Sequence, residues 1–157
     1  MDPGFRIPSS WRKMGISVLS ADQENGDSMN REGKPIPGPW VFHLREEEGG
    51  IHRKLADGVE ARVFPGDNVM LSVVRFEPNA AGRVHNHPEE QWGVLIEGSC
   101  LRIQGDEEVP MRAGDFWHTT SGVPHGLRAG ADGALVLDIF SPPRPEYKKP
   151  GEGFGRP

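Results

Sequence analysis

The chain has 157 residues, a formal net charge of −5 and a pI near 5.7, and its length suits one domain with a hydrophobic core. Its 18 lysines and arginines are scattered rather than gathered in a stripe, which argues against a nucleic-acid binder. A single cysteine excludes an internal disulfide and fits a reducing, cytoplasmic compartment, and no stretch approaches the roughly 18 apolar residues of a membrane span.

The two ends of the chain differ in composition from its middle. Residues 1–39 are polar and interrupted by prolines and glycines, so we predict a mostly irregular, flexible N-terminal arm. Within it only residues 15–19 are apolar enough for a strand, which would add to a sheet edge or to a partner subunit. Residues 146–157 form a Pro/Gly-rich tail that we expect to leave the sheet after its first residues.

Between these ends, residues 40–145 read as a series of short strands joined by turns. Proline and glycine together make up 36 residues, which favours turns over long helices. The close spacing of the strands, without a convincing helical period, predicts an all-β, antiparallel sandwich or barrel. The strands are expected at 40–44, 61–64, 69–76, around 85, and at 92–96, 100–103, 109–111, 116–119, 125–129 and 134–140.

The strand around His85 carries the first sign of a metal site. His85 and His87 are two residues apart, so their side chains point to the same face of an extended strand, and Gln91 keeps that parity. His125 follows a turn later in the chain and supplies a fourth ligand. Three imidazoles and an amide oxygen suit one divalent transition metal, namely Fe, Mn, Ni, Zn or Co.

Two alternatives to this ligand set stay open. Glu90 could replace Gln91 as a ligand, although its parity on an unbroken strand is wrong. The histidines could also fill a polar core without a metal, but each buried imidazole would then bear an uncompensated desolvation cost.

The same residues lie within two motifs that resemble those of the cupin family. The matching positions are His85, His87, Gln91 and Gly98 in the first motif, and Gly114, Gly122 and His125 in the second. The departures are the short spacing from Gly82 to His85, Thr120 in place of a proline and Ala129 in place of an asparagine. None of them removes a ligand. The resemblance implies a single-domain jelly-roll β-barrel with the metal inside its mouth.

A second informative stretch lies near the end of the barrel region. Asp138 is an acid within an apolar strand, and a carboxylate is costly to bury without a partner. Either it pairs with an arginine such as Arg102 or Arg112, or it faces the cavity and acts as an acid or base.

Together with the first motif, the run from Asp138 to Arg144 resembles the single-domain cupins of pectin and alginate breakdown. Those enzymes convert 4,5-unsaturated uronates to linear keto sugars. The resemblance implies that His85, His87, Gln91 and His125 hold the metal. It further implies that Asp138, Phe140 and Arg144 line the substrate site, with Asp138 in proton transfer. Trp92, Phe116 and Trp117 are further candidates for the cavity wall.

Three functional hypotheses follow. The first is a metal-dependent lyase or isomerase of carbohydrate metabolism that acts on a small oxygenated anion, most concretely by opening the ring of unsaturated uronates. The second is another cupin enzyme, an isomerase or decarboxylase of the bacilysin-pathway type or an Fe(II) dioxygenase. The third is a ligand-binding cupin without enzymatic activity. The partners we expect are a small-molecule substrate and a second copy of the chain in a homodimer, since exposed sheet edges invite pairing between subunits.

Overall fold

The computed structural model describes residues 41–45, 47 and 49–155, so the predicted arm at 1–39, with its strand at 15–19, lies outside the described residues. From His43 onward the described chain forms one compact unit. It consists of strands and one short 3-10 helix, which confirms the prediction of an all-β fold. The elements are β1 (Ile51–Ala56), β2 (Val59–Pro65), β3 (Met70–Phe76), β4 (Ala81–His85), β5 (Glu90–Gln104), β6 (Glu107–Arg112), β7 (Phe116–Thr119), β8 (His125–Ser141), η1 (Pro145–Lys148) and β9 (Gly151–Glu152).

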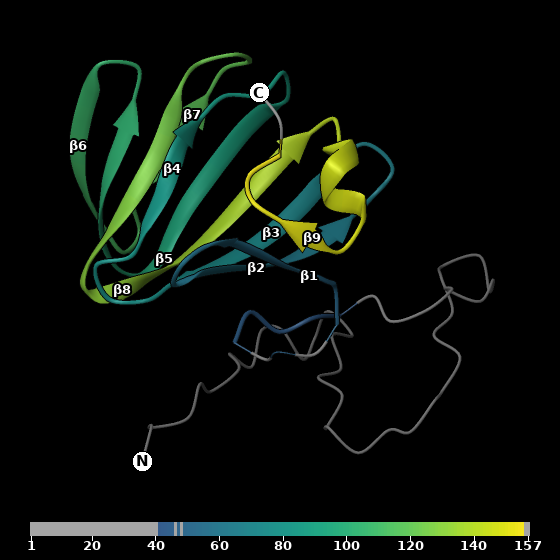
Figure 1. The fold of residues 1–157 in the computed structure, drawn as a ribbon, viewed down its shortest axis with the longest axis horizontal. Coiled ribbons are helices and arrows are strands. Elements are labelled where there is room, and N and C mark those ends of the chain that lie inside the picture. The colour runs from purple at the N-terminus through teal and green to yellow at the C-terminus, as the bar shows by residue number, and fades with distance from the viewer. Residues whose placement is uncertain (1–40, 46, 48, 156–157) are drawn as a thin grey trace, which may run out of the picture. The chain divides into compact units, whose positions relative to one another are not determined.

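The strands belong to a single sheet that curls into a jelly-roll barrel (Figure 1). Its order is β6-β5-β8-β3-β2-β1-β9, while β4 pairs with β8 and β7 pairs with β5. The two longest strands, β5 and β8, lie side by side over most of their length. Each therefore contributes to the wall along the whole barrel, and β8 joins the candidate ligand strand β4 to the centre of the sheet.

Glycines allow β5 and β8 to bend without ending. We expected turns at residues 97–98 and near residue 130, but both lie within continuous strands at irregularities of the β5–β8 register. Gly98 and Gly133 have positive φ angles of 80° and 75°, and a Cβ on Gly98 would lie 2.0 Å from the carbonyl oxygen of Gly133. A glycine with positive φ fits a β-bulge as well as a turn. These glycines do mark a change of backbone direction, but it is a bulge within a strand and not the predicted turn between strands.

Two further predictions at the ends of the barrel were wrong. Residues 41–44 form no strand, and the first described strand is β1, which is joined to β2 by the turn Asp57-Gly58. That dipeptide is a strong hairpin signal. The C-terminal segment does join the sheet, because β9 pairs in parallel with β1 at Arg53 and Lys54.

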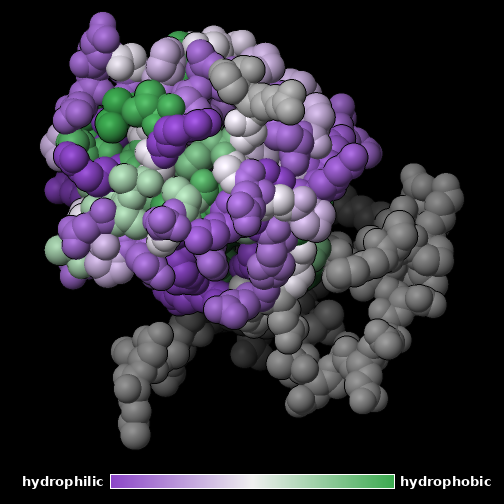
Figure 2. Space-filling model, in the orientation of Figure 1, coloured by the Kyte–Doolittle hydropathy of each residue, from purple (hydrophilic) through white to green (hydrophobic). Residues whose placement is uncertain are grey.

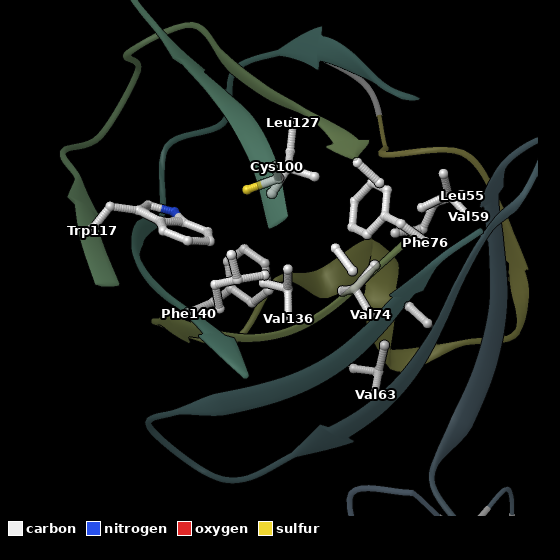
Figure 3. Close-up of a cluster of buried hydrophobic side chains, with 14 of the residues drawn as sticks. Leu55, Val59, Val63, Val74, Phe76, Cys100, Trp117, Leu127, Val136 and Phe140 are labelled. Carbon is white, nitrogen blue, oxygen red and sulfur yellow. The ribbon is translucent and has the colours of Figure 1, made fainter. Parts of the chain in front are cut away.

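The barrel encloses a core whose members come from both layers of the curled sheet. Figure 3 shows Val63 and Val74 toward one end of the cluster, with Trp117 and Phe140 toward the other. The outer surface in Figure 2 is mostly hydrophilic, with hydrophobic residues gathered on the side where Figure 1 places β4, β6 and β7. No helix among the described residues is long and apolar enough to cross a membrane.

Candidate metal centre

The three predicted histidines meet at one end of the barrel interior. His85 ends β4 and pairs in register with His125, which begins β8, while His87 lies in the loop that leads to β5. One nitrogen from each ring lies within 4.8 Å of the nitrogens of the other two. His87 and His125 are buried, with exposed fractions of 3% and 2%. The fold thus brings together residues that lie 40 positions apart in the sequence.

Backbone carbonyls orient all three rings in the same way. Each ring is positioned to donate its Nδ1 hydrogen to a carbonyl two residues away, which leaves Nε2 with a lone pair. These bonds join His85 to Arg83 (2.9 Å), His87 to Glu89 (3.0 Å) and His125 to Val123 (2.7 Å). Such bonds commonly fix the tautomer and direction of metal-binding imidazoles. Nε2 of His125 is buried and has no hydrogen-bond partner.

The histidines are held in the neutral form that metal binding requires. Burial is the largest cause, and it lowers the pKa of His85 to about 4 and that of His125 to about 3. Burial also lowers the pKa of His87, assisted by the positive charge of Arg144. At neutral pH all three Nε2 lone pairs are therefore available to a cation.

Gln91, rather than Glu90, points into this cluster. Its Oε1 lies 3.1 Å from Nε2 of His87, and its Nε2 donates to Oδ1 of Asp138 over 2.7 Å. With the His87 proton on Nδ1, the lone pairs of His87 Nε2 and Gln91 Oε1 face each other at that short distance. A cation bound by both atoms would remove the repulsion between them. Glu90 instead lies 2.8 Å from His118 on the outside of the barrel.

The residues present therefore fit a divalent metal ion. Three neutral imidazole nitrogens converge, a buried nitrogen lacks a partner, and an amide oxygen faces the same point. Nitrogen donors with one amide oxygen suit Fe, Mn, Ni, Zn or Co better than Mg or Ca, which prefer all-oxygen sites.

Asp138 lies beside this cluster, on the inner face of β8. It lines the cavity and accepts a hydrogen bond from Gln91. Burial raises its pKa to about 6, although the nearby charge of Arg102 acts in the opposite direction. Among the described residues no arginine forms an ion pair with Asp138. Of the two expected alternatives, the structure thus has the acid facing the cavity, with a proton affinity suited to transfer near neutral pH.

Arg144 is fully buried and also lines the cavity, but most of its donors are already used. Its Nε and Nη2 donate to Oε1 of Glu146 over 3.0 and 2.6 Å, and Nη2 also donates to the carbonyl of Phe154. Its guanidinium lies 4.2 Å from the centre of the Tyr147 ring. Only Nη1 lacks a partner. Nε of Arg144 also lies 3.9 Å from Oε2 of Glu89, in the loop before β5, so the arginine ties the C-terminal segment to the mouth of the barrel.

The four aromatic candidates for the pocket divide into two pairs. Phe140 and Trp117 line the cavity, and Phe140 contacts the ring of His87 with centroids 5.5 Å apart. Trp92 and Phe116 instead lie on the outer face, with 42% and 67% of their surface exposed. Neighbouring residues on a strand point to opposite faces, so Trp92 must face away when Gln91 faces in. The prediction that these two line the cavity is corrected accordingly.

Sequence reasoning missed Phe154 as part of the site, and it considered Arg102 only as a possible ion-pair partner of Asp138. Phe154 covers His85 with ring centroids 4.5 Å apart and closes the cavity from the C-terminal segment. Arg102 projects into the cavity from β5. A charged residue within the apolar run 100–103 was the available signal for Arg102, whereas a proline- and glycine-rich tail gave none for Phe154.

Comparisons with known proteins agree with this geometry. Residues 72–140 match the family model described as Cupin domain. Oxalate decarboxylase OxdC of Bacillus subtilis (strain 168) is 34% identical over 104 residues, which are 62% of this chain but only 26% of the decarboxylase. The pectin degradation protein KdgF of Dickeya dadantii (strain 3937) is 27% identical over 97 residues, 60% of this chain and 87% of that protein.

A solved structure gives the same fold. KdgF from Halomonas sp. superposes with a TM-score of 0.61 at 22% identity, over 69% of this chain and 97% of that one. The matched family model, the barrel and the three converging histidines lead to one conclusion: residues 72–140 resemble a cupin domain, and the chain resembles the KdgF cupins.

Proposed function

We propose that this protein is a metal-dependent enzyme that opens the ring of small 4,5-unsaturated uronates. The observation that carries the proposal is the hydrogen bond between Gln91 and Asp138, which couples a carboxyl group of pKa about 6 to the candidate metal centre. Similarity to KdgF, whose name assigns it to pectin degradation, supports the choice of substrate class.

In this mechanism His85, His87, Gln91 and His125 would hold the metal. When bound, the ion supplies a Lewis acid that polarises substrate oxygens. Asp138 moves the proton. Ring opening takes a proton from the anomeric hydroxyl and adds one to the carbon beside the new ketone, and a carboxyl group with a pKa near the working pH can do both.

The surrounding residues limit access to the reacting groups. The cavity has a volume of about 40 Å³, which holds water molecules but not a sugar ring. In this mechanism Phe154 and its segment swing aside to admit a uronate and then exclude bulk water, as active-site lids do.

The test combines turnover with metal analysis. Unsaturated uronates prepared with a polysaccharide lyase should lose the ultraviolet absorbance of their ring double bond when the protein is added. Asp138→Asn should abolish this loss while metal content, measured by elemental analysis, stays at the wild-type level. Full activity in that variant would remove Asp138 from the mechanism, and an inactive wild type carrying its metal would refute the proposed reaction.

Decarboxylation of a small carboxylate is the second candidate. The small cavity favours it, and so does the 34% identity to part of OxdC, although this chain spans only about a quarter of that relative. Release of carbon dioxide from oxalate, with no turnover of uronates, would favour this reaction over the first.

The homodimer expected from the sequence is also a proposal. Leu71, Trp92 and Phe116 lie exposed on the outer face of strands β3, β5 and β7, where a second copy could cover them. Light scattering at micromolar concentration should give twice the monomer mass, and a monomer would contradict the proposal.

A further inference from the structure

Arg102 is a buried cation in the wall of the candidate active site. It lies on β5 with 5% of its surface exposed and lines the same cavity as Asp138, His85 and His125. Its guanidinium lies over the ring of Trp117, 5.0 Å from the ring centre. Burial lowers its pKa to about 10, so it is still charged at neutral pH.

The hydrogen bonds of Arg102 do not balance its charge. All of its acceptors are neutral, and Nε has no partner. The acceptors are the carbonyl of Gly126 (3.3 Å), Oε1 of Gln104 (3.4 Å) and Oγ1 of Thr119 (2.7 Å). Among the described residues no carboxylate forms an ion pair with it. The carboxyl group of Asp138 is close enough to interact with the charge of Arg102, since each group favours the charged form of the other, but the two form no direct ion pair. A buried charge that is only partly balanced is costly.

The other buried arginine of the cavity, Arg144, forms a direct ion pair with a carboxylate. Arg144 already has Glu146 as a counter-ion through two hydrogen bonds. Arg53 is buried as well, but it lies outside this cavity and donates to four backbone carbonyls of the C-terminal segment. Arg102 is therefore the cationic side chain of the cavity that a bound anion would neutralise most effectively.

Besides Nη1 of Arg144, two other hydrogen-bond donors without partners line the same cavity. They are the indole nitrogen of Trp117 and the hydroxyl of Ser72, and both side chains are buried. Asp138 on β8 pairs with Ser72 on β3 on one side and with Gly93 on β5 on the other. The Trp117 ring lies over Gly93, so both donors are close to Asp138. The cavity thus presents donors and a cation along one wall and the carboxyl group of Asp138 within it.

We infer that Arg102, not Arg144, binds the anionic group of the substrate. The inference rests on the proposed function in one respect, namely that an anion occupies this cavity. A carboxylate held by Nε of Arg102 would place the rest of a small molecule between Asp138 and the histidine cluster. Arg144 then acts as a positioning residue that holds the C-terminal segment in place.

The experiment uses acetate as the probe, because it is small enough for the closed cavity, and acetamide as its neutral isostere. Titration of the metal-bound wild-type protein is followed by the NMR signal of the Arg102 Nε–H group, which Arg102→Lys identifies by its absence. Affinity is then compared in Arg102→Met, in Arg144→Lys, and in Arg112→Met, which removes an exposed arginine from the neighbouring strand β6.

We expect acetate, but not acetamide, to shift the Arg102 signal in a saturable way. Arg102→Met should weaken acetate binding by about tenfold or more, the usual effect of losing a hydrogen bond to a charged group. The same variant should melt at an unchanged or higher temperature, since it removes a buried charge that no direct ion pair compensates. Arg112→Met should bind acetate as the wild type does, and Arg144→Lys should weaken acetate binding less than Arg102→Met does.

Three outcomes would overturn the inference: an Arg102 signal that acetate does not move, unchanged affinity in Arg102→Met, or a loss of affinity in Arg144→Lys alone. A lower melting temperature with unchanged affinity would give Arg102 a structural role instead. Turnover of unsaturated uronates is measured separately on the wild type. An inactive wild type that binds acetate at Arg102 would refute the proposed function and leave the inference standing.

Discussion

Replacing Asp138 with asparagine should stabilise the protein in a manner that depends on pH. The carboxyl group has its ordinary pKa of 3.8 in the unfolded chain and a pKa of about 6 in the folded one, mainly because burial disfavours its charge. The folded state therefore holds the proton more tightly. Below the unfolded pKa both states are protonated and the group costs nothing. Stability then falls as the pH rises from about 4 to about 6, and the full cost is present above that window.

The size of the effect follows from the shift. A shift of this size corresponds to roughly 3 kcal/mol at pH 8. Asparagine has nearly the same shape, carries no charge and can still accept the hydrogen bond from Gln91. Asp138→Asn should therefore raise the free energy of unfolding by up to about 3 kcal/mol at pH 8 and by about 1 kcal/mol near pH 4.5.

The assay is urea unfolding of the metal-free protein at both pH values, because a bound cation would itself hold Asp138 ionised. Asp132→Asn, which changes an exposed aspartate near the bend of β8, is the matched control and should change stability little at either pH. A gain that is the same at both pH values, or a loss of stability at pH 8, would refute the reasoning that Asp138 is a desolvated acid.

Three further predictions concern the centre and its supports. His87→Ala should lose the metal, seen as a fall in bound metal by elemental analysis, because it removes one of three converging nitrogens; retention of stoichiometric metal would contradict the ligand set. Gly93→Ala should lower stability by about 1–3 kcal/mol, since its Cβ would lie 2.3 Å from the Trp117 ring, and an unchanged urea midpoint would show that this ring can move freely. Arg53→Met should free the C-terminal segment, because four carbonyl contacts are lost; faster cleavage by trypsin at Lys148 would report this, and a wild-type cleavage rate would argue against the anchoring role.

Much of the candidate site was predictable because its residues lie in short, local patterns. The spacing of His85, His87 and Gln91 was predicted from the two-residue repeat of a strand. The structure does bring the three side chains together, but His85 ends β4, His87 lies in the following loop and Gln91 lies on β5. The same repeat also excludes Trp92 from the cavity, since it adjoins Gln91. That prediction failed because parity was not applied to the aromatic residues.

Other features depend on contacts between distant segments. The C-terminal segment reads as a loose tail, yet Tyr147 is buried and Phe154 covers His85. The segment is held against the barrel by Arg53 on β1, which donates hydrogen bonds to backbone carbonyls nearly a hundred residues further along the chain. No local signal marks a backbone carbonyl as the partner of a distant arginine.

The sequence by itself determined the all-β class, the barrel region and the identity of the candidate metal ligands, because strand periodicity and motif spacing are properties of neighbouring residues. Only the tertiary structure decided which cations are neutralised and which are not. Arg102 donates hydrogen bonds to neutral acceptors only, whereas Arg144 donates two to the carboxylate of Glu146. Charge balance is set by what packs around each side chain, and that is fixed only when the sheet closes.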